Sequence, residues 1–499
     1  MNASVLLDTS RNVGPIDRRI FSGFLEHIGR AIYGGVFDPG NPSSNDPGFR
    51  EDVLEALRPM RMPLVRYPGG NFVSNYDWRD AIGSREQRPS RPDFAWKTVE
   101  PNTFGVDEFM AWCRRLDTGA MMVVNLGTGD AKQAAQLVEY CNLPGGTYWA
   151  DRRIANGSKK PYGTKLWCLG NEMDGPWQAG HVPPGVYAHR AKQAGQLMKG
   201  LDPTIELVVS GSSTPGMASY MEWDRIVLEH CWDHVDYIAT HHYSRNYPDD
   251  TARFLAEGVE IDRIIEDYAA LTRYVRARKK SDRQVHLAFD EWNVWYREQD
   301  QQSEWWQQAP HLLEEVYNLE DALVVAQYLS SFVRHADTVK VACLAQIVNV
   351  LAPILTRPDG LLVQSIYYPF VLYAKHAQGA SLAPVVDSPT YHAGDRGEVP
   401  VVDVAACHDP ERSRATLFLV NRDLQREMTV NVTLYGATVE SVAEVTFLSG
   451  TDPKAANSWE DSNVVTLAPG EADVTADGRV RAQVPALGLA VVALKLSAQ

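Results

Sequence analysis

Short apolar runs alternate with segments of helical periodicity from about residue 20 to about residue 350. The runs are Ile20–Leu25, Leu64–Tyr67, Met121–Leu126, Leu166–Leu169, Glu206–Ser210, Tyr237–Thr240, Val285–Phe289 and Val339–Ile347. The helical segments between them include Val106–Leu116, Gly185–Leu201, Ile261–Arg278 and Leu319–Ala336. Strands that alternate with helices pair in parallel, because a parallel crossover needs a connection of helix length. Eight repeats over roughly 330 residues predict an α/β fold, a (β/α)8 TIM barrel.

The pattern changes after about residue 380, where strand-like segments follow one another without a long helix. These segments are Val401–Ala405, Ala415–Val420, Met428–Leu434, Val439–Phe447, Asn463–Leu467 and Leu487–Leu496. Turn residues separate them, which is typical of an antiparallel β-sandwich, here of the jelly-roll kind. Ala3–Leu7 is also strand-like, and we expect it to join this sandwich. The predicted division is 1–15 for that N-terminal strand, 16–378 for the barrel and 379–499 for the C-terminal sandwich.

Polar residues gather at the ends of the predicted barrel strands. They are Glu26-His27, Arg66 to Asn71, Asn125, Asn171-Glu172, Ser210, His241 to Tyr243, Glu291 and Gln346 to Asn349. In such barrels the C-terminal ends of the strands build the active site. We therefore expect these residues to form one site at that rim.

Two of the apolar runs lead into a glutamate, Glu172 in one case and Glu291 in the other. A buried charge needs a partner or a chemical task. Cleavage of a glycosidic bond needs two carboxyl groups, one to protonate the leaving oxygen and one to attack the anomeric carbon or activate water. Strands four and seven lie on roughly opposite sides of the ring, so these glutamates can face each other across a sugar. In a retaining enzyme they should lie ~5–5.5 Å apart.

Longer motifs around these residues carry a family resemblance. They are Gly170-Asn171-Glu172, Phe24 to Arg30, Arg66 to Asn71, Tyr76 to Arg79 and Phe289 to Asn293. They resemble the α-L-arabinofuranosidases of glycoside hydrolase family 51, over nearly the whole chain. The resemblance implies a retaining exo-enzyme that hydrolyses terminal non-reducing α-L-arabinofuranosides in arabinan, arabinoxylan or arabino-oligosaccharides by double displacement. It also implies a homohexamer. No cofactor is expected, since this hydrolysis needs only carboxylates and water.

The resemblance also implies roles for individual residues. Glu172 would be the general acid/base and Glu291 the nucleophile. Sugar hydroxyls would be bound by Glu26, Asn71, Asn171 and Gln346, while Tyr243 would hold the nucleophile and His241 would lie close to the acid/base. Arg66 is expected to keep Glu291 ionised, because a nearby cation lowers the pKa of a carboxylate. Trp96 and Trp295 are candidates for the walls of the site, since aromatic rings suit the apolar faces of sugars.

Several residues have alternative interpretations. Asp290 is an alternative to Glu291 as the functional acid. Neighbouring strand residues point to opposite sides, so only one of the two should face the barrel centre, and the motif favours Glu291. Further alternatives are an ion pair of Glu26 with Arg30, a turn role for Asn71, His242 in place of His241, and Gln364 or Asn349 in place of Gln346.

Other functions also stay open at this point. A β-xylosidase or a β-glucanase would use the same two glutamates, and a sugar-binding protein that has lost catalysis would keep the fold. A metal hydrolase would need a spaced His pair on one strand and further ligands on other strands. His241 and His242 are adjacent and so face opposite ways, and no other strand end supplies a second His pair. We therefore expect no metal site.

Composition narrows the partners. The 499-residue chain has a formal net charge of −15, with 44% apolar and 22% charged residues. This is typical of a globular protein, and the negative charge argues against a nucleic-acid partner. No apolar run approaches the roughly 18 residues that span a membrane, and no signal-peptide pattern opens the sequence. We therefore expect a cytoplasmic protein. Six cysteines form no Cys-x-x-Cys pair, so the usual zinc and redox motifs are absent.

Overall fold

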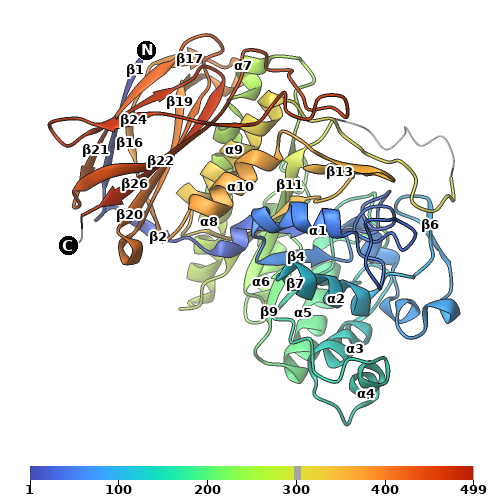
Figure 1. Ribbon diagram of the computed structural model, residues 1–499. Helices are drawn as coiled ribbons and strands as arrows, with labels where there is room; N and C mark the ends of the chain where they lie inside the picture. Colours follow the sequence, from blue (N-terminus) through green and yellow to red (C-terminus); the bar gives the residue numbers. More distant parts are fainter. Residues whose placement is uncertain (297–304, 498–499) are drawn as a thin grey trace.

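The computed structural model describes residues 1–296 and 305–497. Eight parallel strands close into a barrel, which confirms the predicted fold (Figure 1). In spatial order they are β10 (Tyr237–Ser244), β11 (His286–Val294), β12 (Val339–Ala345), β3 (Ser22–Phe24), β4 (Leu64–Tyr67), β7 (Gly119–Val124), β8 (Leu166–Leu169) and β9 (Glu206–Val209). Each overlaps one predicted run. The main difference precedes β3, where Arg18–Phe21 form a 3-10 turn capped by the carboxylate of Asp17.

The α-helices follow the barrel strands and cover them. They are α1 (Glu51–Leu57), α2 (Val106–Leu116), α3 (Ala131–Asn142), α4 (Tyr148–Ala155), α5 (Pro184–Leu201), α6 (Glu222–Cys231), α7 (Thr251–Phe254), α8 (Glu257–Lys279), α9 (Leu319–Arg334) and α10 (Tyr367–His376). In α2, the carboxylate of Glu108 accepts a hydrogen bond from the N–H of Gly105 at 2.9 Å, which satisfies a free donor at the helix start. Asp117 ends the helix in a left-handed conformation.

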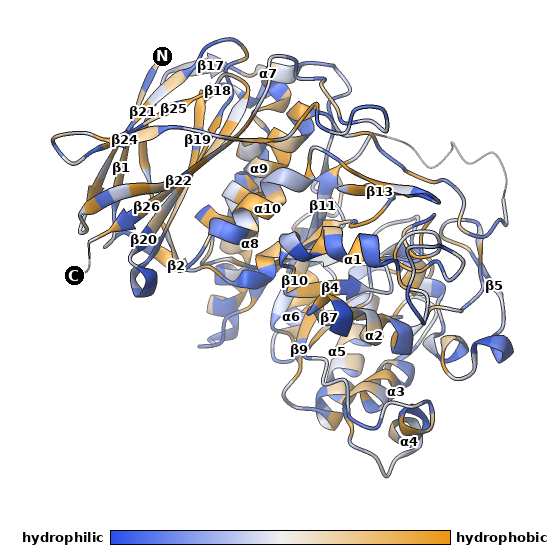
Figure 2. Cartoon of the chain, viewed as in Figure 1, coloured by the Kyte–Doolittle hydropathy of each residue, from blue (hydrophilic) through white to orange (hydrophobic). Residues whose placement is uncertain are grey.

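Two helices lie between the barrel and the C-terminal sheets (Figure 1). Every residue of α9 from Leu319 to Val333 is buried, because the helix contacts β11 of the barrel and β19 and β20 of the sheets. A helix that is buried on all sides must be largely apolar around its whole circumference. Figure 2 shows hydrophobic residues along both α9 and α10. These helices therefore tie the two parts of the chain together.

The C-terminal part is a sandwich of two sheets. One sheet has the order β16 (Val385–Asp387), β1 (Asn2–Asp8), β21 (Met428–Tyr435), β25 (Val480–Val484) and β24 (Ala472–Val474). The other has the order β2 (Asn12–Pro15), β15 (Ala380–Leu382), β19 (Val402–Asp409), β20 (Arg414–Asn421), β26 (Gly488–Leu496), β22 (Val439–Ser449) and β23 (Leu467–Pro469). Short hairpins elsewhere pair β5 (Arg91–Asp93) with β6 (Thr98–Glu100), β13 (Ile354–Arg357) with β14 (Gly360–Val363), and β17 (Thr390–His392) with β18 (Glu398–Pro400).

The sandwich differs from the prediction in three details. The N-terminal strand β1 joins it as expected, but it pairs in parallel with β21. The predicted strand Asn463–Leu467 is wrong, because the strand begins only at Leu467. Asn457 explains this: its side chain bonds both the N–H and the C=O of Val465, at 2.7 and 3.0 Å, in place of a neighbouring strand. β25 was not predicted, although it alternates buried and exposed residues.

Within residues 1–296 and 305–497, no helix is both long enough and apolar enough to cross a bilayer.

Candidate active site

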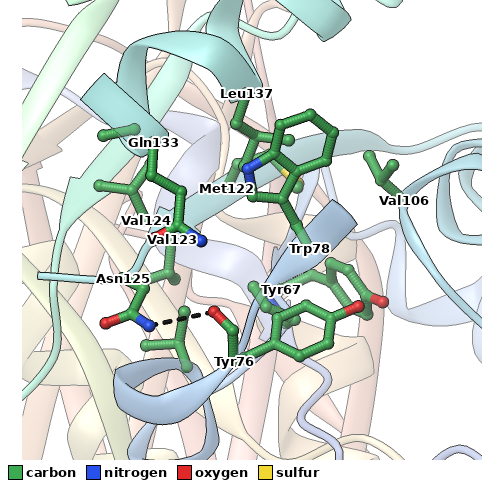
Figure 3. A pocket seen from close by; sticks show the side chains of 13 residues that line it. Tyr67, Tyr76, Trp78, Val106, Met122, Val123, Val124, Asn125, Gln133 and Leu137 are labelled. Carbon is green, nitrogen blue, oxygen red and sulfur yellow. Dashed lines mark hydrogen bonds between the residues drawn. The ribbon is translucent and has the colours of Figure 1, made fainter. Parts of the chain in front are cut away.

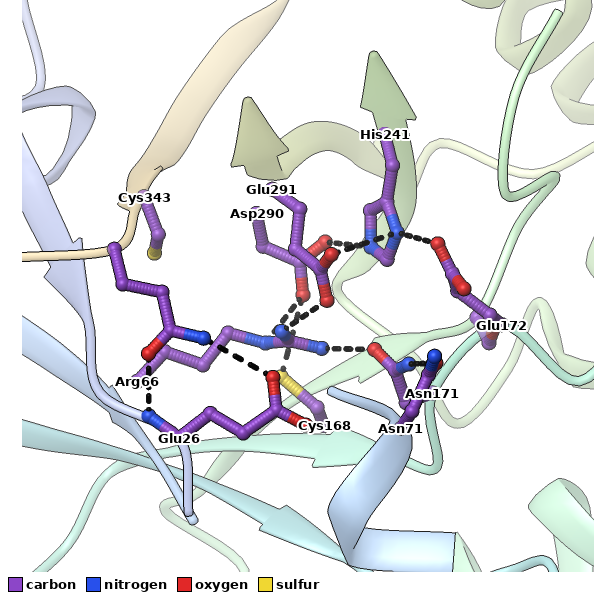
Figure 4. Close-up of polar contacts among 12 residues, drawn as sticks. Glu26, Arg66, Asn71, Cys168, Asn171, Glu172, His241, Asp290, Glu291 and Cys343 are labelled. Carbon is purple, nitrogen blue, oxygen red and sulfur yellow. Dashed lines mark hydrogen bonds and ion pairs between the residues drawn. The ribbon is translucent and has the colours of Figure 1, made fainter. Parts of the chain in front are cut away.

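The predicted site residues meet at the C-terminal ends of the barrel strands (Figure 4). Glu291 lies within β11, and Glu172 follows β8 in a sharp turn in which Gly170 has φ +84° and Glu172 has φ +43°. A non-glycine residue rarely adopts a left-handed backbone conformation, and such strain collects at functional sites. The turn brings the Glu172 carboxylate back over the barrel mouth.

His241 lies between the two glutamates. Its Nδ1 is 2.8 Å from Oε1 of Glu172 and 3.6 Å from Oε2 of Glu291, and these ligand-type atoms all lie within 4.8 Å of one another. Burial alone would lower the pKa of His241, but the negative charges around it raise that pKa well above its ordinary value. The imidazole is therefore a cation at neutral pH. The spacing of these three residues would also suit a metal ion.

Glu291 is held by two further side chains. Its Oε1 accepts a hydrogen bond from Arg66 at 2.7 Å, and its Oε2 accepts one from the hydroxyl of Tyr243 at 2.9 Å. Burial raises the pKa of Glu291, while the positive charges of His241 and Arg66 act in the opposite direction. The expected lowering by Arg66 is thus present, but it only offsets part of the effect of burial. Trp295 packs edge-on against Tyr243, with ring centroids 5.1 Å apart.

Asp290 faces the same side as Glu291, contrary to the sequence prediction. Its Oδ2 lies 3.1 Å from Nε of Arg66, its Oδ1 lies 3.1 Å from Nε2 of His241, and the side chain is 1% exposed. The reason is a bulge in β11: the register with both neighbouring strands shifts at this position, which breaks the strict alternation of side chains. Burial would raise the pKa of Asp290, but the charges of Arg66 and His241 hold it below its ordinary value.

Glu26 anchors a second group of predicted residues. Its Oε1 accepts hydrogen bonds from the indole of Trp96 at 3.0 Å and from the N–H of Phe72 at 2.9 Å, while Gln346 donates to its Oε2 at 3.1 Å. Burial, followed by the charge of Glu291, raises the pKa of Glu26 to about 8. The alternative ion pair with Arg30 does not form, because Arg30 bonds Glu314 instead, at 2.8 Å.

Asn171 and Asn71 complete the constellation. Asn171 accepts a hydrogen bond from Arg66 at 2.7 Å and donates to Asn71 at 3.4 Å. The alternatives to Gln346 and His241 have other partners: Gln364 bonds the backbone of Glu315 and Ala352, Asn349 bonds Arg30 and Thr356, and His242 bonds Glu257. The predicted site residues therefore form two hydrogen-bonded groups, one around Glu291 and one around Glu26, and Gly70 lies close to both glutamates.

Asn125, also at a strand end, belongs to a different feature. It lines a small, mainly apolar cavity of about 20 Å³, and none of the predicted site residues lines that cavity. Figure 3 shows Asn125 among the side chains around it. The side chain of Asn125 donates to the C=O of Tyr76 at 3.0 Å and accepts from the N–H groups of the following loop. Its role is to shape that loop.

Sequence reasoning missed two residues that touch the cluster. Trp177 donates from its indole N–H to Oε2 of Glu172 at 2.6 Å. Gly70 lies close to both Glu26 and Glu291. A Cβ at Gly70 would be 2.9 Å from Oε2 of Glu26 and 3.2 Å from Oε1 of Glu291. The signal for Gly70 was the Gly69-Gly70 pair after β4, whereas nothing in the pattern pointed to Trp177.

Known proteins were compared with the chain as a whole. The family model of the α-L-arabinofuranosidase 1 domain matches residues 56–258, and that of the α-L-arabinofuranosidase C-terminal domain matches residues 290–487. A *Bacillus subtilis* protein named intracellular exo-α-(1→5)-L-arabinofuranosidase 1 is 43% identical over 479 residues, which cover 95% of this chain and 96% of that protein.

Two *Bifidobacterium longum* proteins are also similar. One, named exo-α-(1→6)-L-arabinofuranosidase, is 40% identical over 507 residues, covering 98% of this chain and 97% of its own. The other is the solved structure of AbfB, described as a family 51 α-L-arabinofuranosidase, with a TM-score of 0.95, 36% identity and 99% coverage of both chains. Since both family models match and relatives of this identity span nearly the full chain, the protein belongs to the α-L-arabinofuranosidases of glycoside hydrolase family 51.

Proposed function

We propose that this protein is a retaining exo-α-L-arabinofuranosidase that releases terminal non-reducing α-L-arabinofuranosides by double displacement. The observation that carries the mechanism is the spacing of Glu172 and Glu291, whose oxygens approach within 4.8 Å with His241 between them. Retaining enzymes hold their carboxyl groups ~5–5.5 Å apart, whereas inverting enzymes leave ~6.5–9.5 Å for a water molecule. The short spacing favours direct attack by a carboxylate.

In the first step, the carboxylate of Glu291 attacks the anomeric carbon while Glu172 donates a proton to the leaving oxygen. In the second step, Glu172 removes a proton from water, which attacks the arabinosyl ester on Glu291 and frees the sugar. Arg66 and Tyr243 fix both oxygens of the nucleophile before the reaction. Because the fold already holds the nucleophile in its reactive orientation, the barrier of the first step is lower.

The remaining side chains would bind sugar hydroxyls. Glu26, with a pKa of about 8, is neutral at pH 7, so it can donate a hydrogen bond as well as accept one. A neutral Glu26 also places no second negative charge beside the nucleophile. Asn71, Asn171 and Gln346 offer amide donors and acceptors next to it, and Trp96 and Trp295 supply aromatic faces.

The wider biological setting is part of the proposal. Arabinan, arabinoxylan and arabino-oligosaccharides are the proposed substrates, and the names of the relatives include both (1→5) and (1→6) linkages. The word intracellular in the name of the *B. subtilis* relative supports a cytoplasmic location. The homohexamer rests on the family resemblance. The alternative β-xylosidase or β-glucanase activity is not favoured by these relatives.

A panel of aryl glycosides tests the proposal. We expect the α-L-arabinofuranoside to be cleaved fastest, and proton NMR should detect the α-anomer of arabinose as the first product. Glu291→Ala should lower kcat by several orders of magnitude. The matched control is Glu314→Gln, since Glu314 pairs with Arg30 outside the cluster. Faster cleavage of the xyloside or glucoside would refute the sugar assignment, and the β-anomer as first product would refute retention.

A further inference from the structure

Trp177 contacts Glu172 but has no role in the function proposed above. Its indole N–H donates to Oε2 of Glu172 at 2.6 Å, yet half of its side chain (50%) is exposed to solvent. The other carboxylate oxygen, Oε1, is bonded to His241. The two oxygens of Glu172 are therefore held by different partners, the buried His241 and the half-exposed Trp177.

The turn after Glu172 leaves room for the indole of Trp177 next to the Glu172 carboxylate. The N–H of Gly175 donates to the C=O of Glu172 at 2.9 Å, which closes a tight turn after the left-handed Glu172. A Cβ on Gly175 would lie 2.5 Å from Cε2 and 2.9 Å from Nε1 of Trp177. Because no real Cβ approaches that closely, the indole can reach Glu172 only over a glycine.

The role of a general acid indicates which part of the substrate lies next to Oε2 of Glu172. A general acid has to touch the oxygen of the leaving group, which departs from the nucleophile toward solvent in an exo-enzyme. Glu291 lies on the Oε1 side of Glu172 with His241. Trp177, on the Oε2 side, therefore borders the leaving group.

We propose that Trp177 is a positioning residue for the acid/base: its N–H fixes the Glu172 carboxylate while its exposed ring borders the leaving sugar. This inference rests on the proposed role of Glu172. The hydrogen bond from the indole and the contact with His241 together fix the orientation of the Glu172 carboxylate. The other charged or titratable groups that face Glu172 are His241 and Tyr243 on β10, Glu291 on β11 and Asp174 in its own turn.

Three variants separate the N–H from the ring and from the turn. Trp177→Phe keeps an aromatic ring but removes the donor, and Trp177→Ala removes both. Gly175→Ala keeps the indole but pushes it off Glu172. The control is Gly185→Ala, because a Cβ at Gly185 meets no atom within 4 Å. Thermal unfolding of each variant first checks that it is folded.

The measurement is kcat/KM on two arabinofuranosides, one with a good leaving group that needs little protonation and one with a poor leaving group, across a range of pH. For Trp177→Phe and Gly175→Ala we expect about a tenfold loss on the poor leaving group, as for a lost hydrogen bond to a charged group, and less than a twofold loss on the good one. Trp177→Ala should lose further activity on arabino-oligosaccharides.

Equal losses on both leaving groups, or wild-type rates for Trp177→Phe, would overturn the inference. Failure of the proposed function would look different, because the wild-type enzyme itself would then not cleave the arabinofuranosides. If Gly175→Ala does not fold, Trp177→Phe still decides the question.

Discussion

Replacing Asp290 by Asn tests whether the buried charges next to Glu172 and Glu291 stabilise the barrel. Asp290 is 1% exposed, and its two oxygens each lie 3.1 Å from a cationic nitrogen, Nε of Arg66 and Nε2 of His241. Asparagine has nearly the same shape but carries no charge. The substitution therefore removes two charge interactions while leaving the packing in place.

The expected cost follows from the surroundings of Arg66. Removal of one partner from a buried ion pair costs ~3–5 kcal/mol. Arg66 keeps its bond to Glu291 at 2.7 Å, and the amide oxygen of Asn can still accept a hydrogen bond, so we expect about 2–3 kcal/mol. The unfolding entropy is ~2.1 cal/mol/K per residue, or about 0.75 kcal/mol/K for the roughly 350 residues from β3 to α10, so the thermal midpoint should fall by about 3–4 °C.

Thermal unfolding at pH 7, followed by tryptophan fluorescence, measures this shift. The control is Asp473→Asn on the sandwich surface, where Asp473 pairs with Arg481 and both side chains are about half exposed; no measurable shift is expected. Because the pKa of Asp290 is lowered in the folded protein, its contribution is present above the unfolded value near 3.8 and is lost as the pH falls further. A midpoint within one degree of wild type at pH 7 would refute the reasoning.

Three further variants test other parts of the cluster. Glu26→Gln should flatten the pH dependence of the unfolding free energy between about pH 4.5 and about pH 8. In the wild type, the folded state holds a proton on Glu26 that the unfolded chain releases, so stability falls with rising pH in that window by up to about 1.4 kcal/mol per pH unit. Urea unfolding at several pH values measures this difference. Gly70→Ala should lower kcat/KM about tenfold or more, because its Cβ would crowd Oε2 of Glu26 at 2.9 Å and displace a carboxylate; Gly185→Ala, with open space around it, is the control. Tyr243→Phe removes the donor to Glu291 and should lower kcat/KM about tenfold on the aryl arabinofuranoside, with unchanged far-UV circular dichroism.

The barrel and most of the candidate site could be predicted because both are marked by local sequence patterns. Each barrel strand is an apolar run that must be buried on both faces, and its polar end can only belong to the rim. Gln346 and Glu26 are 320 positions apart, yet their strands β12 and β3 are neighbours in the ring, so the closure of the barrel brings them together. Knowing the ring order was enough to place them.

The incorrect and missed predictions have a common physical cause. In each case the local backbone departs from regular strand geometry. The bulge in β11 turns Asp290 toward the barrel centre, and periodicity cannot reveal a bulge. Asn457 satisfies the backbone of Val465, so an apolar stretch that resembles a strand forms a turn. Trp177 lies five residues after Glu172 and reaches it across a turn whose shape depends on Gly175. The pattern of polar and apolar residues does not encode the shape of that turn.

The bulge at Asp290 also explains how the two proposed catalytic carboxylates, Glu172 and Glu291, can share one buried site. Arg66 and His241 supply two positive charges, Asp290 takes up one of them, and Glu26 is neutral at pH 7. One positive charge remains for Glu172 and Glu291 together. The proposed double displacement starts from one charged and one protonated carboxyl group, and this charge balance matches that requirement. Without Asp290, two cations would face the pair, and the match would be lost. Asp290→Asn should therefore impair cleavage of poor leaving groups more than that of good ones.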